Sequence, residues 1–276
     1  RGHRVGVYNT RSTRTIEGAG VKVVLLAGGL GTRMREETEY RPKPMVEVGG
    51  RPVLWHIMKG FAHHGFNEFV VCTGYRGEVI KDYFLNYEGR NHDFTVRLGQ
   101  PAEVSYHSDH EEAGWQITVA DTGANTMTGG RVKRIERHIG AERCIVTYGD
   151  GLVDVDIPGL LDYHEAHGKL ATVTTIRPLS RFGVMDMSKD GTVQRFREKP
   201  VTDDYVNAGF FVFEPKVFDY LDEECVLEQE PLESLAKDGQ LVAFRHEGFW
   251  QPMDTVRERD LLADLWHSGE APWRVW

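Results

Sequence analysis

The chain has 276 residues, of which 40% are hydrophobic, so it can bury a substantial core as one enlarged α/β domain or as two smaller ones. Its formal net charge of −9 argues against nucleic acid or an anionic membrane as a partner, because both favour a basic protein surface. The sequence contains no apolar stretch of membrane-spanning length and no recognisable leader, so a cytoplasmic location is the default expectation.

The first twenty residues differ in composition from the rest of the chain. Residues 1–20 carry many arginines and small polar residues and show no periodic apolar face. We therefore expect an N-terminal tail that is flexible and lies outside the folded core. From Val21 onward, strand patterns alternate with helix patterns, and residues 21–276 are predicted to form a single domain.

A glycine-rich loop follows the first predicted strand. Val21 to Leu26 is an almost unbroken aliphatic run, typical of a parallel strand that is buried on both faces. The sequence Ala27-Gly28-Gly29-Leu30-Gly31-Thr32-Arg33 comes next, and Lys43 follows within Arg41-Pro42-Lys43-Pro44. Unobstructed backbone N–H groups converge readily on phosphate oxygens, and the two cations add mobile positive charge. This combination predicts binding of a nucleoside triphosphate.

Two common phosphate loops do not fit this sequence. The Walker loop requires Gly-Lys-Ser or Gly-Lys-Thr after four free positions, and residues 28–34 contain neither. The dinucleotide fingerprint requires a third small residue, but that position is Met34, whose side chain would obstruct close packing of helix on strand.

The next elements follow from hydrophobic periodicity and from glycine and proline signals. Helices are predicted over 53–64 and 78–86, with a strand over 68–73 between them. The pattern alternates from Val96 to Asp121, which predicts a small antiparallel insertion near 96–121. Its strands are expected to include 103–107 and 116–120.

The second half of the chain continues the alternation. A short basic helix is predicted over 131–139 after a Thr128-Gly129-Gly130 turn, a strand over 144–148, a helix over 158–167 and a strand over 170–176. Further strands are expected at 184–187, 193–197, 210–214 and 241–245, with helices near 216 and 230 and over 255–266. These repeated units imply a mostly parallel sheet, at whose carboxyl ends ligands gather.

Acidic side chains stand at two places where a hard cation could bind. Asp150 follows a hydrophobic strand between two glycines, and Asp254 precedes the last predicted helix. Mg²⁺ prefers one or two carboxylates together with substrate phosphates and water. The alternative for each aspartate is that it caps a helix.

A further polar group follows the strand over 193–197. Glu198-Lys199-Pro200 and Asn207-Ala208-Gly209 together could form a pocket for a hydroxylated ring, with Lys199 on an attached phosphate. Exposed Glu–Lys pairs are usually only solvated.

The remaining reactive or aromatic residues are expected to be structural. Cys72, Cys144 and Cys225 are too far apart in sequence to form a disulfide framework or metal knuckle. The histidine pairs 63–64 and 164/167 are expected to lie in the core or on the surface rather than to bind metal. The tryptophans at the C-terminal end are expected to serve core or subunit packing: Trp250, Trp266, Trp273 and Trp276.

These motifs resemble those of the sugar-1-phosphate nucleotidyltransferases. The resemblance covers about 21–276 and rests on 26–33, Pro42-Lys43-Pro44, Tyr148-Gly149-Asp150-Gly151, Glu198-Lys199-Pro200 and Asp254. Within that family the chain is most similar to the glucose-1-phosphate cytidylyltransferases, and this similarity rests on the sequences of residues 43–50, 54–59, 121–123, 127–131 and 248–255. The resemblance implies the nucleotide-diphospho-sugar transferase fold, which is a Rossmann-like, mostly parallel sheet flanked by helices.

The resemblance also implies a set of site residues. The nucleotide would be held by Leu26, Ala27, Gly28, Gly29, Gly31, Thr32, Arg33, Lys43, Thr126, Arg131 and Gly149. The sugar phosphate would be held by Gly183, Glu198, Lys199, Asn207 and Gly209. Asp150 and Asp254 would share Mg²⁺, and the catalytic residues would be Arg33, Lys43, Asp150 and Lys199. Asn207-Ala208-Gly209 has alanine where relatives often have glycine, which bears on sugar identity.

The implied reaction is transfer of the cytidylyl group of CTP to glucose 1-phosphate, giving CDP-glucose and pyrophosphate. The same chemistry with UTP or dTTP remains an alternative, because the residues that choose the base are not evident in the sequence. A non-catalytic nucleotide-sugar-binding protein on the same fold is a third possibility. Relatives commonly form symmetric oligomers, so a homo-oligomer is expected.

Overall fold

A computed structural model describes residues 20–99, 103–107, 110–180 and 182–276 of the chain. The predicted N-terminal tail, residues 1–20, therefore lies outside the described residues except for Gly20.

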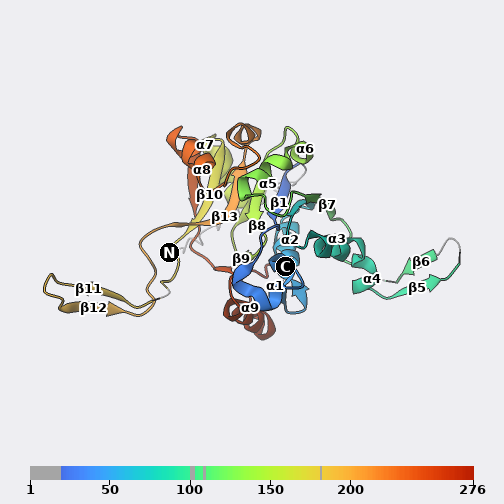
Figure 1. Cartoon of the computed structure of the whole chain (residues 1–276), viewed down its shortest axis with the longest axis horizontal. Coiled ribbons are helices and arrows are strands. Elements are labelled where there is room, and N and C mark those ends of the chain that lie inside the picture. The colour runs from blue at the N-terminus through green and yellow to red at the C-terminus, as the bar shows by residue number, and fades with distance from the viewer. Residues whose placement is uncertain (1–19, 100–102, 108–109, 181) are drawn as a thin grey trace, which may run out of the picture.

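A seven-stranded mixed sheet forms the centre of the molecule (Figure 1). Its order is β14 (Leu241–Arg245), β10 (Ala171–Ile176), β13 (Val206–Phe213), β8 (Cys144–Tyr148), β1 (Lys22–Leu26), β4 (Glu68–Thr73) and β7 (Gln116–Asp121). Strands β8, β1, β4 and β7 are parallel, as are β10 and β14, whereas β13 runs antiparallel to both of its neighbours. The predicted Rossmann-like, mostly parallel sheet is confirmed.

The centre of the sheet is buried on both faces, which explains the aliphatic run that forms β1. Val23 and Leu25 pack into one hydrophobic cluster, whereas Val24 and Leu26 pack into another, as expected for side chains that alternate along a strand. The first cluster includes residues of α2 (Val53–His63), α7 (Ile157–His167) and α9 (Val256–Ser268). The second includes residues of α5 (Thr128–Arg134), α6 (Glu136–Ile139), the 3₁₀ helix η3 (Pro215–Tyr220) and α8 (Glu230–Lys237).

One predicted turn is instead the start of a helix. Helix α5 begins at Thr128, so Gly129 and Gly130 lie in its first turn. A Cβ at Gly130 would come within 2.2 Å of the Glu223 carbonyl oxygen, and one at Gly129 within 2.9 Å of the Cys225 carbonyl oxygen. The two glycines therefore allow close backbone packing, and that packing decides their conformation against their weak helix propensity.

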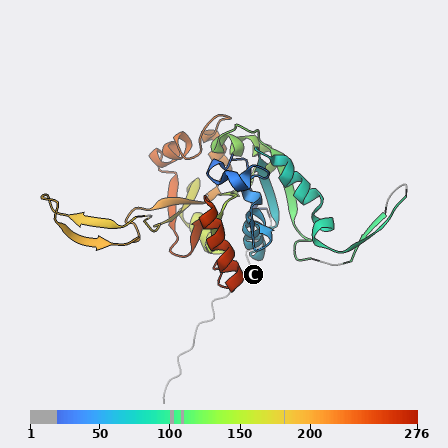
Figure 2. The ribbon, with the colours of Figure 1, turned by 60° about the horizontal axis from the view of Figure 1, so that its bottom comes forward.

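Two hairpin arms extend from opposite sides of the body (Figures 1 and 2). One comprises β5 (Phe94–Arg97) and β6 (Glu103–Tyr106), and the other β11 (Val184–Met187) and β12 (Val193–Arg197). The predicted antiparallel insertion corresponds to the first arm. The prediction that 116–120 belongs to it was wrong, because β7 pairs parallel to β4 at the edge of the main sheet.

The small elements bring distant segments together. Strand β9 (Gly151–Val153) pairs antiparallel with β15 (Trp250–Pro252), and Gly151 lies opposite Pro252. The remaining short elements are η1 (Thr32–Met34), α1 (Arg35–Thr38), η2 (Lys43–Met45), β2 (Glu47–Val48), β3 (Arg51–Pro52), α3 (Gly77–Leu85) and α4 (Tyr87–Asn91). Among the described residues, none of the helices combines the length and apolar character needed to cross a bilayer.

The aromatic C-terminal end packs around one buried histidine. The rings of Trp55, Trp266 and Trp273 lie edge-on to His56, with centroids 5.2, 4.7 and 6.2 Å away. His56 Nε2 lies 2.8 Å from the carbonyl oxygen of Val48. The prediction that the C-terminal tryptophans serve packing is confirmed for Trp266, Trp273 and Trp276, all of which pack in or against the first hydrophobic cluster.

Candidate active site

The glycine loop leaves the carboxyl end of β1 and packs closely on a buried arginine. A Cβ at Gly28 would lie only 2.1 Å from Nη1 of Arg131, so no larger residue fits without moving that guanidinium. Gly31 adopts a left-handed conformation with φ 61°, which favours glycine, and leads into η1. At Gly29, by contrast, an added Cβ would meet nothing within 4 Å. The loop is therefore packed against Arg131 at Gly28, whereas Gly29 has free space beside it.

Arg131 ties three loops of the sheet edge together. Its Nη1 donates to the carbonyl oxygens of Thr73 and Gly123 at 3.0 and 2.8 Å, and its Nη2 donates to that of Gly28 at 3.0 Å. Burial lowers the pKa of the guanidinium, which nonetheless remains charged at neutral pH. The structure thus places Arg131 beneath the glycine loop, with its donors directed at backbone carbonyls.

Two carboxylates from distant parts of the chain meet at one lysine. Lys43 Nζ donates to Asp150 Oδ2 and to Asp254 Oδ1, each at 2.6 Å. Arg33 Nη1 donates to the second oxygen of Asp254 at 2.7 Å. Burial acts to lower the pKa of Lys43, but attraction and hydrogen bonds from both aspartates outweigh it, and the net pKa is raised. Four predicted residues therefore form one charged cluster.

A cavity of about 540 Å³ opens between the glycine loop and this cluster. Predicted residues on its wall are Leu26, Gly28, Gly29, Gly31, Thr32, Arg33, Lys43, Thr126, Arg131, Asp150 and Asp254. Ala27 and Gly149 support the loop through their backbones: Ala27 N donates to Cys72 O and Gly149 N donates to Leu26 O, each at 3.0 Å. The volume is sufficient for a small organic ligand.

Several residues of the wall were not predicted to be site residues, although Leu30, Pro44, Met127, Thr128 and Tyr148 lie within motifs on which the family resemblance rests. The residues not predicted are Leu30, Pro44, Ala124, Asn125, Met127, Thr128, Tyr148, Val226 and Glu228. Residues 124–128 follow β7 after two residues and lead into α5, so recognising β7 as a parallel strand would have placed them at the same sheet edge. Val226 and Glu228 carry no local motif, because only the tertiary fold brings their loop beside Tyr148.

Asn207 and Gly209, two of the residues predicted to bind the sugar, lie beside Tyr148. The Tyr148 hydroxyl donates to Glu228 and accepts from Asn207 Nδ2 at 3.1 Å. Burial, followed by the Glu228 carboxylate, raises the pKa of Tyr148. Gly209 has φ 82°, and its N–H donates to Asn207 Oδ1 at 2.8 Å. Ala208 is buried, and its carbonyl oxygen accepts from Trp250 Nε1 at 3.1 Å.

The other predicted sugar residues lie near the base of the β11–β12 arm. A Cβ at Gly183 would lie 3.1 Å from Glu198 Oε2, and Lys199 Nζ lies 4.0 Å from Glu198 Oε1. The Lys199 side chain is 53% exposed. Gly183, Glu198 and Lys199 thus lie together, but in the described part of the chain they do not contribute to the wall of the cavity that holds Asp150 and Asp254.

The sequence and the fold are similar to those of known proteins. Residues 22–251 match the sequence pattern of the nucleotidyl transferase family. The chain is 49% identical over 259 residues to a glucose-1-phosphate cytidylyltransferase of Salmonella typhimurium, covering 93% of this chain and all of that protein. It is 30% identical over 252 residues to a mannose-1-phosphate guanyltransferase of Aspergillus oryzae, covering 88% of this chain and 63% of that protein. The structure of HddC from Yersinia pseudotuberculosis superposes with a TM-score of 0.65 at 21% identity, covering 89% and 99% of the two chains.

Proposed function

Because the chain belongs to the nucleotidyl transferase family, we propose that it transfers the cytidylyl group of CTP to α-D-glucose 1-phosphate, giving CDP-glucose and pyrophosphate. A phosphate oxygen of the sugar attacks the α-phosphorus of CTP, the bond to the β-phosphate oxygen breaks, and pyrophosphate leaves. The proposal depends above all on the meeting of Asp150 and Asp254 at Lys43 beside the glycine loop. No protein nucleophile is needed.

The chain's own cations would bring two polyanions together. The loop over 28–33 would hold the triphosphate through its backbone N–H groups, with Arg33 and Lys43 on the phosphate oxygens. Arg131 would act indirectly, because its donors fix the carbonyl oxygens beneath the loop. Rate acceleration would then come from alignment of the reactants and from neutralisation of developing charge.

Members of the family generally use divalent metal ions, and the donor set in this chain suits Mg²⁺. Asp150 Oδ2 and Asp254 Oδ1 both approach one cationic nitrogen at 2.6 Å, so these two oxygens already converge on a single positive charge. Asp150 and Asp254 would hold the ion, which when bound supplies charge neutralisation for the triphosphate. Lys43, released from the two carboxylates, would be free to bind a phosphate oxygen.

The sugar phosphate would bind on the side of Tyr148 and the β11–β12 arm. Asn207 and Gly209 would contact the sugar from beside Tyr148, with Gly183 and Glu198 on its hydroxyls. Lys199 would hold the phosphate group, because its ammonium is exposed and only loosely paired with Glu198.

Assembly into a homo-oligomer is part of this proposal. Both arms expose apolar side chains, among them Phe94 at 46% and Phe196 at 58%. Contiguous exposed apolar surface is typical of protein–protein contacts. Light scattering on the purified chain would determine the mass, and a monomer at all concentrations would contradict this part of the proposal.

Turnover with three nucleotides tests the function. Pyrophosphate release would be measured with glucose 1-phosphate and CTP, UTP or dTTP, and the product identified by mass. CTP is expected to give the highest kcat/KM. A higher kcat/KM with UTP or dTTP would show that the enzyme catalyses the same reaction with a different nucleotide. Binding of the nucleotides without turnover would support a non-catalytic nucleotide-sugar-binding protein.

A further inference from the structure

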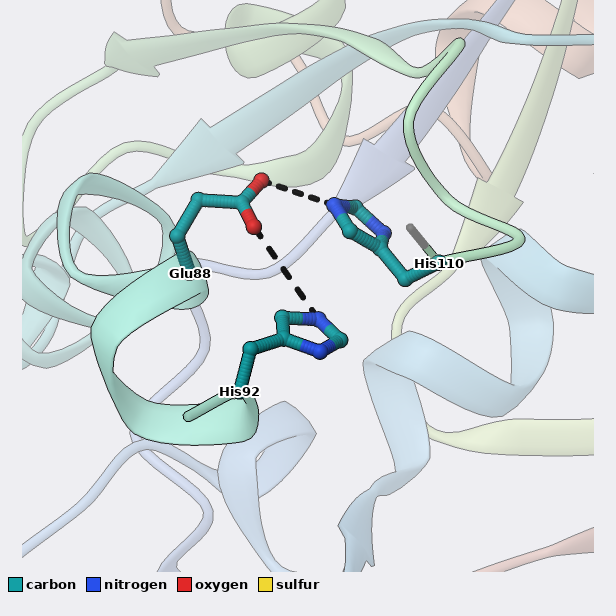
Figure 3. Close-up of side chains that lie close together, drawn as sticks. All are labelled: Glu88, His92 and His110. Atoms are coloured by element: carbon teal, nitrogen blue, oxygen red, sulfur yellow. Dashed lines mark hydrogen bonds and ion pairs between the residues drawn. The ribbon is translucent and has the colours of Figure 1, made fainter. Parts of the chain in front are cut away.

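A second group of metal-ligand side chains lies outside the cavity, at the base of the β5–β6 arm (Figure 3). Glu88 belongs to α4, His92 directly follows that helix, and His110 lies between β6 and β7. His110 Nε2 is 2.7 Å from Glu88 Oε1, and His92 Nε2 is 4.0 Å from Glu88 Oε2. The two imidazole rings lie nearly parallel, with centroids 4.6 Å apart.

The spacing of these donor atoms is compatible with one transition-metal ion. One donor atom from each residue lies within 4.8 Å of the other two. Around tetrahedral Zn²⁺, with metal–nitrogen and metal–oxygen distances near 2.0–2.2 Å, ligand atoms are separated by about 3.3 Å. Adjustments on the order of an ångström in side chains would therefore bring all three donors onto one ion. Two imidazoles and one carboxylate favour zinc and similar metals over Mg²⁺, which prefers oxygen.

Neighbouring residues already orient one of the ligands. His110 Nδ1 lies 3.3 Å from Glu112 Oε2, on the opposite side of the ring from Glu88. Glu112 in turn accepts from the buried Lys59 Nζ at 2.8 Å. A ligating histidine usually donates its other ring N–H to a carboxylate, which fixes its tautomer and direction. His110 therefore has the surroundings expected of a metal ligand that binds through Nε2.

The partial burial of the group also suits a metal site. The side chains of His92 and His110 are only 12% and 11% exposed, whereas Glu88 is 42% exposed. A site with two sheltered imidazoles and one accessible carboxylate holds its ligands in place and leaves a fourth position for water.

We propose that Glu88, His92 and His110 bind a Zn²⁺-class divalent ion, at a site separate from the one where Asp150 and Asp254 would hold Mg²⁺. The ion would fix the arm to the body, since His92 precedes β5 and His110 follows β6. The base of the arm is already closed between these positions, because His107 N donates to Asp93 O at 3.0 Å. None of the three ligands lines the described wall of the cavity that holds Asp150 and Asp254, so the ion would act on the arm and turnover would not depend directly on it, even though three protein ligands leave a position for water.

The full chain, stripped of metal and kept in excess Mg²⁺ to occupy the active-site carboxylates, would be titrated with Zn²⁺ by calorimetry. One Zn²⁺ per chain is expected. Co²⁺ in its place should give the absorption of a four-coordinate nitrogen and oxygen site, and Zn²⁺ should slow amide exchange in β5 and β6. If Zn²⁺ does not bind stoichiometrically, or leaves exchange in the arm unchanged, the proposal fails.

Variants assign the ligands. His92→Ala and His110→Ala should each lose the Zn²⁺ equivalent, whereas the matched control His63→Ala, on the exposed end of α2, should keep it. Glu112→Gln should bind Zn²⁺ roughly 10–100-fold more weakly, as for other residues that orient a ligand. Unchanged Zn²⁺ binding in the folded double variant of His92 and His110 would overturn the assignment. If that variant does not fold, the Co²⁺ spectrum and amide exchange of the unaltered chain decide.

Discussion

Asp150 and Asp254 accept hydrogen bonds from the same ammonium nitrogen, that of Lys43, at 2.6 Å each. The pairing of β9 with β15 explains how they meet, because Asp150 precedes β9, and Asp254 follows β15 after one residue. Met253 N also donates to Asp150 O at 2.9 Å. The alternative that Asp254 caps the last helix is wrong: the N-cap of α9 is Thr255, whose side chain accepts from Glu258 N.

Asp150→Asn tests whether this carboxylate acts in the reaction. The amide keeps the size of the side chain but removes one negative charge from the pair that would hold Mg²⁺. We expect an intact fold and a loss of at least about a hundredfold in kcat, the scale seen when one preorganised electrostatic group is removed. Circular dichroism would report the fold and pyrophosphate release the rate. Asp162→Asn, on the exposed face of α7, is the matched control, and turnover of Asp150→Asn at the control's rate would refute the role.

Lys43→Met should separate Mg²⁺ binding from catalysis. The lysine ammonium competes with a metal ion for both carboxylates, so its removal leaves Asp150 and Asp254 without their shared cation. Without nucleotide, the Lys43→Met variant should therefore bind Mg²⁺ more tightly than the unaltered chain does. Mg²⁺ should also raise the Tm of the variant more than it raises the Tm of the unaltered chain. Turnover should nevertheless fall, because a phosphate cation is lost.

The matched control for this variant is Lys216→Met, in an exposed position of η3. Calorimetry would give the Mg²⁺ affinities of both variants and of the unaltered chain. A weaker Mg²⁺ affinity in Lys43→Met than in Lys216→Met would show that the two carboxylates do not form the metal site.

Gly28→Ala and Gly29→Ala form a second matched pair. At Gly28 the new methyl group would meet the buried guanidinium of Arg131, whose hydrogen bonds hold three loops. Overpacking of this kind costs roughly 1–3 kcal/mol of the free energy of unfolding. At Gly29 the methyl group meets nothing within 4 Å, so the expected change is within about 0.5 kcal/mol. Denaturant unfolding would measure both, and equal stabilities would contradict the proposed packing of Arg131.

The fold was largely predictable because its signals are local and periodic. The aliphatic run of β1 and the glycines after it follow directly from burial on both faces and from a loop at a strand end. The error at Gln116–Asp121 has a physical cause. This strand lies at the sheet edge and is only half-buried, so its side chains alternate as they do in antiparallel strands.

The site was predictable where residues follow parallel strands and less so elsewhere. Asp150 could be placed at a sheet edge from its own sequence context, and the fold brings Asp254 to it. The direction of a long side chain is not encoded locally, which is why the sequence could not reveal that Arg131 binds backbone carbonyls. Glu88 and His92 have a visible helical spacing, but their proximity to His110 depends on how the arm closes.

His56 makes the free energy of unfolding depend on pH. Burial among tryptophans, more than any other cause, lowers the pKa of its imidazole from 6.5 to about 4. Between these values the unfolded chain binds a proton at this site and the folded chain does not, so unfolding becomes easier as pH falls. The contribution is fully present above pH 6.5 and lost progressively down to about pH 4, and it amounts to roughly 3 kcal/mol for a shift of this size.

His56→Gln should remove this dependence, because glutamine offers a polar group towards Val48 but does not titrate. Stability would be measured by denaturant unfolding at several pH values between 6.5 and 4, and the slope compared with that of the unaltered chain. The free energy of unfolding should depend less steeply on pH in His56→Gln, because the contribution of His56 is lost. The contribution of the carboxylates remains in both proteins. His63→Gln controls for loss of an exposed histidine and should keep the full slope. If His56→Gln and His63→Gln gave the same slope of unfolding free energy against pH, His56 would have to be protonated in the folded chain. That result would contradict a neutral imidazole packed between Trp266 and Trp273.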